Sequence, residues 1–219
     1  TEVDNTPGSW YTENDIVYIH TIDSRPADDK IRPYMSVYNC NVSNNVTLYI
    51  EGIHLEGGSA GALRGDIGSR IYAKNCSFKY AQGNGGYQIV GAVEVFSQNC
   101  INARNENDGF NYHANNGVAP KFIEVDCIGR DNGSQTNSNG STAHGGAVGI
   151  RINGQYDDNF GPNVADINIG TQTWNLGCRA SGSVLRDGYQ IAEGEAWYDG
   201  CVGYGNEQFD LLTGSGGTA

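Results

Sequence analysis

Short apolar segments recur along this chain at a nearly constant distance, with polar turns between them. The segment Arg70–Cys76 is followed by Gly85–Val90, and the same pair of patterns returns at Glu94–Cys100 and Asp108–His113. A fixed period of about 20–29 residues, with two short β-like segments in each copy, is typical of a stacked repeat. The pattern therefore predicts strands that stack from one copy to the next.

Cysteines mark this period along most of the chain. The same place in the repeat is filled by Cys76, Cys100, Cys127, Cys178 and Cys201, and by Ile53 one copy earlier. Cys40 lies outside the register. Residues in one place on successive coils lie about 4.8 Å apart, so we expect an inward stack of small apolar side chains. A disulfide framework is the alternative interpretation of six cysteines.

The interval from Cys127 to Cys178 is about two periods long, which we interpret as one coil with two insertions. The polar stretches Arg130–Gly146 and Gln155–Asp166 are expected to be loops, and Ala147–Gly154 the second strand of the coil. Repeat proteins often carry such insertions on their binding side. A tolerated surface insertion without function is the alternative.

The chain is expected to have three parts. Residues 1–47 lack the repeat but contain two strand-like segments, Ile16–His20 and Ile31–Tyr38, so they are interpreted as an N-terminal cap or edge-strand segment. The repeat itself occupies residues 48–214, and residues 215–219 form a tail.

Composition narrows the fold and the partners. With 32 glycines the chain is too glycine-rich for a helical protein, and with 13 tyrosines it is too aromatic for a disordered one. A net charge of −12 argues against nucleic acid and anionic membranes as partners. No run of about 18 apolar residues is present to span a membrane.

These observations predict an all-β fold, a right-handed parallel β-helix of about five to six coils. Asn75, Asn99 and Asp126 precede successive cysteines and are expected to stack at a turn in left-handed conformations. The competing fold is a β-sandwich, which predicts strands about every 8–12 residues but no recurring residue type. The cysteine register favours the β-helix.

Over about Val46–Leu212, the repeat resembles the pectate-lyase-like superfamily and the β-helices of phage tailspikes and depolymerases. The resemblance implies an extracellular or virion-surface domain that binds, and could cleave, an acidic polysaccharide, with a homotrimer as the assembly. It lies in the repeat pattern, which is more specific for fold than for function. The alternative function is a structural β-helix without chemistry, such as a fibre shaft or an adhesin.

Aligning the second segments predicts columns of outward side chains about 4.8 Å apart. One predicted column contains Arg64, Gln88, Asn111, Arg151, Gln190 and Asp210, and its neighbour contains His113 and Asn153. Such columns suit hydrogen bonds to a sugar chain that runs along the helix. The expected substrate-binding residues are Gln88, Asn111, Asn153 and Gln190.

A third predicted column contains two carboxylates. Asp108 and Asp187 are expected two coils apart, about 9.6 Å between backbones. This value is at the upper edge of the roughly 6.5–9.5 Å separation of carboxyl groups in inverting glycosidases, where one acts as acid and the other as base. The alternative is that Asp-Gly marks a turn.

The hexapeptide Asp108–His113 is similar to the Tyr-Gly-Phe-Asp-Pro-His motif of β-helical mannuronan epimerases. It matches at Gly109, Phe110 and His113, whereas Asp108 and Asn111 stand at the positions of the catalytic Tyr and Asp. The departure argues against carrying over the epimerase mechanism as a whole.

His113 could still act as a base beside a sugar carboxylate that Arg151 neutralises. His144, at the end of the first expected loop, could be brought near His113. An exposed histidine without a catalytic role is the alternative for His113.

No cofactor is expected, with one exception. Asp157 and Asp158 could bind calcium together with loop carbonyls, although a solvated turn is the favoured interpretation. The chain has no C-x2-C pair and its histidines are far apart in sequence, so no other metal site is predicted.

Overall fold

The computed structural model describes residues 10–13, 16–19 and 37–214, and the chain divides into two units, 1–34 and 35–219. In the first unit, β1 (Trp10–Glu13) pairs with β2 (Ile16–Ile19) in antiparallel fashion. Residues 31–36 of the second strand expected in this region, and the tail 215–219, lie outside the described residues.

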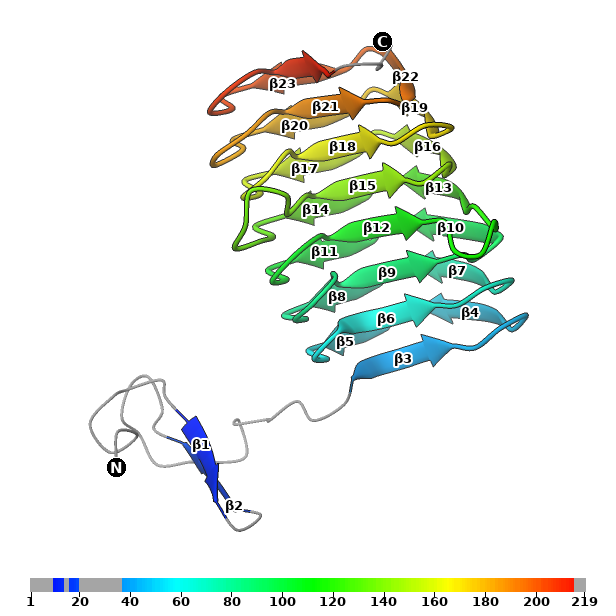
Figure 1. Ribbon diagram of the computed structural model, residues 1–219, viewed down its shortest axis with the longest axis vertical. Helices are drawn as coiled ribbons and strands as arrows, with labels where there is room; N and C mark the ends of the chain where they lie inside the picture. Colours follow the sequence, from blue (N-terminus) through cyan, green and yellow to red (C-terminus); the bar gives the residue numbers. More distant parts are fainter. Residues whose placement is uncertain (1–9, 14–15, 20–36, 215–219) are drawn as a thin grey trace. The chain divides into compact units, whose positions relative to one another are not determined.

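The second unit is a parallel β-helix of about seven coils, and the described residues contain no helix (Figure 1). Each coil contributes one strand to each of three parallel sheets. The front strands in Figure 1 run to the right and the rear strands to the left while the chain climbs, which makes the helix right-handed. The expected fold class is therefore confirmed.

The three sheets are named by number, and their strands are as follows. Sheet 1 contains β3 (Tyr38–Val42), β6 (Gly61–Gly65), β9 (Tyr87–Val90), β12 (Phe110–His113), β15 (Ser141–His144), β18 (Val164–Ile167), β21 (Tyr189–Ala192) and β24 (Leu211–Thr213). Sheet 2 contains β4 (Thr47–Glu51), β7 (Arg70–Lys74), β10 (Glu94–Gln98), β13 (Lys121–Val125), β16 (Val148–Ile152), β19 (Gln172–Leu176) and β22 (Glu195–Asp199). Sheet 3 contains β5 (His54–Glu56), β8 (Ser77–Lys79), β11 (Ile101–Ala103), β14 (Ile128–Arg130), β17 (Gln155–Asp157), β20 (Arg179–Ser181) and β23 (Val202–Tyr204).

The expected number of coils was too low because the interval between Cys127 and Cys178 contains two coils instead of one. β15 lies inside the first expected loop, and β17 and the start of β18 lie inside the second. The strand expected at Ala147–Gly154 exists as β16, but it belongs to sheet 2. The supposed insertions are therefore regular parts of the repeat.

A glycine hides the extra coil from the cysteine pattern. Gly154 occupies the cysteine place, because Gln155 pairs with Ile128 and Arg179 donates its backbone N–H to the carbonyl of Gly154. A Cβ atom at Gly154 would lie 2.4 Å from the hydroxyl oxygen of Tyr156. The tyrosine ring thus fills the space that a thiol fills on the neighbouring coils.

The cysteine stack itself is confirmed. All six cysteines are free, and those buried in the stack are Cys76, Cys100, Cys127 and Cys178, with Cys201 half-buried on the last coil. The Cys100 thiol lies 3.5 Å from the carbonyl oxygen of Ala73 and 3.4 Å from that of Gln98. Ile53 keeps the predicted register but is 42% exposed, because no described strand of sheet 3 precedes β5. The prediction that Ile53 lies in the dry interior was wrong.

Two ladders of polar turn residues hold successive coils in register. The predicted left-handed turn is confirmed, with φ of 54° at Asn75, 51° at Asn99 and 52° at Asp126. Asn153 extends this ladder at φ 53° and donates its amide to Asp126 Oδ1 at 3.2 Å. A buried ladder that the sequence analysis missed consists of Asn105, Asn132 and Asn159, whose amides donate from one coil to the next at 3.0 Å.

The interior changes along the helix axis. One apolar cluster fills the N-terminal coils and a smaller one, around Tyr156 and Tyr189, fills the C-terminal coils. Between these clusters lie three charged side chains with no exposed surface, Glu124, Arg151 and Asp166. Buried charges are costly unless they are paired and hydrogen-bonded, so this layer depends on partners within the interior.

Candidate functional site

Four of the predicted site residues come together at β12 and β15, on the outer face of sheet 1. The two strands pair in parallel, and His113 is the register partner of His144. The rings lie 4.3 Å apart between centroids in an edge-to-face arrangement. His144 was expected to reach His113 from a loop, but a regular strand carries it there.

A chain of hydrogen bonds joins these residues across two coils. Asn111 donates its amide to Asp108 Oδ2 at 2.6 Å, and Asn111 Oδ1 lies 3.1 Å from His144 Nε2. The NH2 group of Asn111 donates to the carboxylate, so the amide oxygen of Asn111 faces the imidazole of His144. Because that oxygen can only accept a hydrogen bond, Nε2 of His144 must carry the proton. The neutral ring then keeps a free electron pair on Nδ1.

Burial sets the charge states of this cluster. Burial, together with the neighbouring His113, lowers the pKa of His144 to about 4. Burial also raises the pKa of Asp108 to about 7, against the hydrogen bonds from the Asn139 backbone and from Asn111. At neutral pH the cluster therefore offers an uncharged, half-buried imidazole beside the exposed His113.

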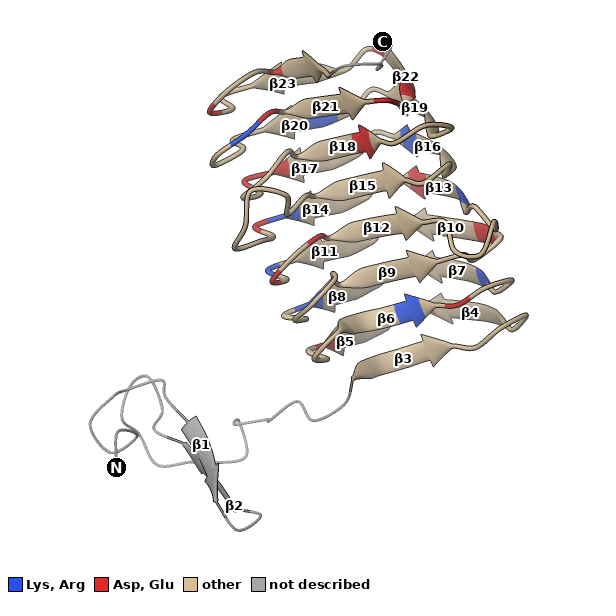
Figure 2. Cartoon of the chain, viewed as in Figure 1, with Lys and Arg blue, Asp and Glu red and all other residues tan. Residues whose placement is uncertain are grey.

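The predicted polar column continues from this cluster toward the N-terminal coils. Gln88 of β9 is the register partner of Asn111, and Arg64 of β6 is the partner of Gln88. Arg64 Nη1 donates to Gln88 Oε1 at 3.4 Å, while Arg64 Nε donates to Asp66 Oδ1 at 2.6 Å. Charged residues are otherwise sparse on this sheet (Figure 2).

Toward the C-terminus the column departs from the prediction. After Asn111 it runs through Thr142 and Ala165 to Gln190, which lies three coils away. Thr142 is absent from the predicted column because the polar composition of residues 130–146 predicts a loop there. Leu212, and not Asp210, follows Gln190 in this register. The alternation of small and polar residues in Ser141–His144 is the signal that could have identified the strand.

The two carboxylates expected to act together are too far apart. Asp108 and Asp187 precede β12 and β21, which are separated by three coil steps, so their backbones lie about 14 Å apart. This exceeds the roughly 6.5–9.5 Å between the carboxyl groups of inverting glycosidases. Asp187 Oδ1 accepts the backbone N–H of Phe209 at 3.2 Å, and Asp108 Oδ1 accepts that of Asn139 at 2.8 Å. Both side chains brace a turn against the next coil.

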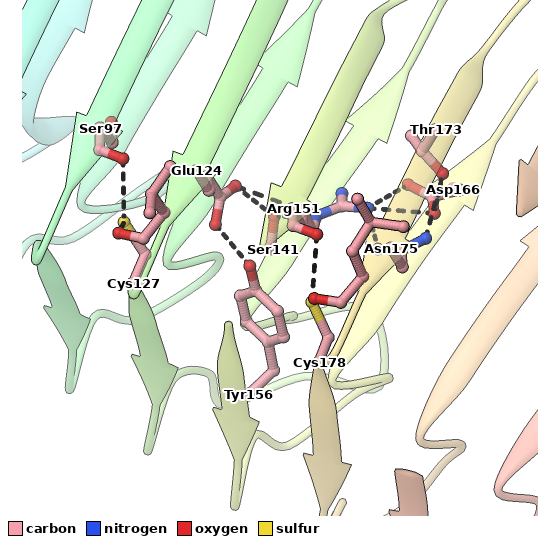
Figure 3. Close-up of polar contacts among 12 residues, drawn as sticks. Ser97, Glu124, Cys127, Ser141, Arg151, Tyr156, Asp166, Thr173, Asn175 and Cys178 are labelled. Carbon is pink, nitrogen blue, oxygen red and sulfur yellow. Dashed lines mark hydrogen bonds and ion pairs between the residues drawn. The ribbon is translucent and has the colours of Figure 1, made fainter. Parts of the chain in front are cut away.

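Arg151 does not lie in the predicted column, because it belongs to sheet 2 and points inward (Figure 3). Its Nη1 donates to both oxygens of Asp166, at 2.9 and 3.1 Å, and its Nε donates to Ser141 Oγ at 2.8 Å. Glu124 Oε1 lies 3.9 Å from Nε. A side chain without exposed surface cannot neutralise a sugar bound outside, so that expectation was wrong.

The buried charges instead connect the sheets of the interior. Asp166 comes from sheet 1, Glu124 and Arg151 from sheet 2, and Tyr156 of sheet 3 donates its hydroxyl to Glu124 Oε2 at 2.6 Å. Burial raises the pKa of Glu124, against the charge of Arg151 and the hydroxyl donors. Burial opposes the charge on Arg151, but Asp166 and Glu124 outweigh it and raise its pKa. The layer is structural, since none of it reaches solvent.

The remaining predicted residues do not join the cluster on sheet 1. Asn153 belongs to the turn ladder between sheets 2 and 3, where it bonds to Asp126. Asp157 Oδ1 accepts Ser181 Oγ at 2.6 Å and Arg179 Nε at 3.1 Å, so its carboxylate is already in use. Among the described residues, no three or more His, Cys, Asp or Glu side chains gather as a metal site.

Comparison with known protein families, with curated proteins and with solved structures gave no match to this chain. Within the described part of the chain, no helix is long and apolar enough to cross a membrane. A fold alone does not determine a function, which depends instead on the side chains at the surface of the β-helix.

Proposed function

We propose that the outer face of sheet 1, from β6 to β15, binds a polysaccharide chain along the helix axis. The observation that supports this proposal is one continuous column, Arg64–Gln88–Asn111, with the paired rings of His113 and His144 in the neighbouring column. Successive coils repeat hydrogen-bonding groups about every 4.8 Å, which suits a ligand that is itself a repeating chain.

The charge of this column limits the kind of sugar. Its only cation is Arg64, which already pairs with Asp66 at 2.6 Å, and the whole chain carries a net charge of −12. A densely acidic polysaccharide would be repelled. We therefore propose a sparsely acidic chain, with a uronate carboxylate competing with Asp66 for Arg64.

The histidine pair supports a cleavage step at the same face. Arg64 lies three strands of sheet 1 from His144, or about 14 Å, so the reacting sugar is a different uronate from the one at Arg64. His144 Nδ1 would take the proton from the sugar carbon next to the carboxylate of that second uronate, and the released electron pair would form a carbon–carbon double bond. The glycosidic oxygen would leave with a proton from water, so the reaction class is β-elimination. A neutral imidazole is suited to this role because only its unprotonated nitrogen can act as the base.

The proposal also keeps the finer resemblance to the pectate-lyase-like and tailspike β-helices, and with it an extracellular or virion-surface location. A structural β-helix is the second candidate function. It is favoured by a different observation, the apolar side chains on the outer face of sheet 2.

The test is a panel of neutral, sparsely acidic and polyuronic polysaccharides, measured for binding and for the ultraviolet absorbance of an unsaturated uronide. We expect Gln88→Ala and Asn111→Leu to weaken binding roughly tenfold each. His144→Gln should abolish cleavage while binding remains. Gln208→Ala, at an exposed glutamine distant from the column in sequence, is the matched control. Absence of binding across the panel by the wild type would exclude the proposal.

A further inference from the structure

The outer face of sheet 2 carries a column of large apolar side chains, one from each strand. This apolar stripe consists of Tyr49, Tyr72, Phe96, Ile123, Ile150, Trp174 and Trp197. Its aromatic ends are stacked, with ring centroids 4.7 Å apart for Tyr49 and Tyr72 and 4.7 Å for Trp174 and Trp197. The stripe therefore presents flat, preformed rings at both ends.

The centre of the stripe widens into an apolar patch. Val125, Ile152 and Leu176 flank it on one side and Val148 on the other, and a groove of about 410 Å³ lies over β7 to β19. Leu176 is 37% exposed and Trp197 is 43% exposed. Contiguous apolar surface of more than a few hundred Å² is unusual on a monomer and indicates a binding partner.

Charge differs between the two ends of this patch. Outward side chains of β7 are basic, Arg70 and Lys74, whereas those of β22 are acidic, Glu195 and Asp199. Arg70 lies 3.6 Å from Glu94 and Lys74 lies 3.2 Å from Glu51, but both cations are about half-exposed and stay accessible to a partner. In the strand order β7-β10-β13-β16-β19-β22, these two strands lie equally far from the midpoint between β13 and β16. Six of the seven strands of this face are thus symmetric about the midpoint, with β4 beyond them, and the two ends of these six strands are opposite in charge.

We propose that this face binds a second copy of the chain, related by a two-fold axis that runs along the strands between β13 and β16. Such a rotation reverses the order of the strands but keeps each position along them. Arg70 then faces Glu195 of the second copy, and Lys74 faces its Asp199. A C2 dimer with a self-complementary interface is the commonest assembly of identical chains.

The same rotation matches the apolar side chains. The facing pairs are Tyr72 with Trp197, Phe96 with Trp174, and Ile123 with Ile150, each formed twice. A trimer with parallel helix axes would instead place the basic strands of neighbouring copies at one level, and like charges across an interface are unfavourable. Charge complementarity therefore favours the antiparallel pair over the parallel trimer implied by the tailspike resemblance.

The area predicts a weak dimer. Six strands about 4.8 Å apart, each five residues long at about 3.3 Å per residue, cover roughly 400–500 Å² per copy. The total of about 900 Å² lies below the standard interface of about 1,600 Å². We expect dissociation constants in the micromolar range, and hence a monomer in dilute samples.

Sedimentation equilibrium over about 1–500 μM tests the interface. The wild type should form dimers, and Ile150→Arg at the centre should weaken the dimer at least about 100-fold. Val202→Arg makes the same change at a residue of sheet 3 that is 52% exposed, and it should leave the dimer unchanged. A wild type that stays monomeric throughout, or that forms trimers, would overturn the proposal.

A charge exchange tests the orientation. Lys74→Glu and Asp199→Lys should each weaken the dimer roughly tenfold or more, whereas Lys79→Glu on sheet 3 should not. Mixing the two interface variants should restore the wild-type affinity, because opposite charges then meet at both sites. Positions 74 and 199 are five strands apart within one chain, so only another chain can supply this rescue. If the mixture does not regain the wild-type dimer affinity, the antiparallel arrangement is rejected.

A glycan is the other occupant that this face could take. If the Trp174→Ala variant lost sugar binding while the wild type stayed monomeric, the face would belong to a glycan.

Discussion

The outer faces of sheets 1 and 2 differ although their backbones repeat with the same register. On sheet 1, Arg64 of the column donates a hydrogen bond to Gln88, and Gln88 is only 6% exposed although it points outward. On sheet 2, large apolar side chains such as Trp197 remain 43% exposed. The backbone does not distinguish the two faces, so the outward residue of each coil decides whether a face is polar or apolar.

The two faces are coupled through the interior, because the buried layer of Glu124, Arg151 and Asp166 connects sheet 1 with sheet 2. The largest effect is expected from Arg151→Ala, which leaves two carboxylates buried without their counter-charge. The variant should lose about 3–5 kcal/mol of unfolding free energy, and the proposed sugar binding and dimer formation should be lost together. Chemical denaturation measures the loss, and acid should reduce it by protonating the carboxylates. Arg130→Ala, at a side chain that is 54% exposed, is the control. A loss below about 1 kcal/mol for Arg151→Ala would show that the layer does not hold the sheets together.

The second prediction concerns sheet 1 alone. The pKa of Asp108 rises from 3.8 to about 7 on folding, so its contribution to stability is complete below about pH 4 and is lost as pH rises through 7. Asp108→Asn should remove this loss, which amounts to up to about 4 kcal/mol of unfolding free energy between pH 4 and 8. Measured unfolding free energy against pH should show the difference.

The same pH titration contains an opposite contribution from His144. Its pKa falls from 6.5 to about 4 on folding, so the stability it contributes is present above about pH 6.5 and is lost as pH falls through 4. His144→Gln should remove this acid-side loss. Glu94→Gln on sheet 2 is the control, and it should leave the dependence of the unfolding free energy on pH unchanged. If the unfolding free energy of Asp108→Asn depends on pH as in the wild type, the buried carboxyl of Asp108 does not cause the loss of stability above pH 4.

The smallest effect is expected from Asn111→Leu, which breaks the hydrogen-bond chain. We expect a loss of about 1 kcal/mol of stability, together with a second imidazole tautomer at His144. Nitrogen NMR should show Nε2 protonated in the wild type and a mixture of tautomers in the variant. The ring of His54, bonded to Ser77 on sheet 3, should not change. A single unchanged tautomer would show that Asn111 does not orient the ring.

The sequence alone predicted the stacked repeat, the free cysteines, the left-handed asparagine turns and the first half of the polar column. These features are local: a strand that alternates inward and outward residues at a constant period allows one register only. The alignment of Arg64, Gln88 and Asn111 in one column therefore follows from the sequence period alone.

The tertiary structure alone decided the number of coils, the direction of Arg151 and the meeting of the two histidines. Gly154 carries no cysteine because the ring of Tyr156 fills its space, and no local pattern reveals that contact. Arg151 points inward because Asp166 and Ser141, from another sheet, compensate its charge there. Burial of a charge depends on partners that are distant in sequence, whereas the period of a strand depends only on its neighbours.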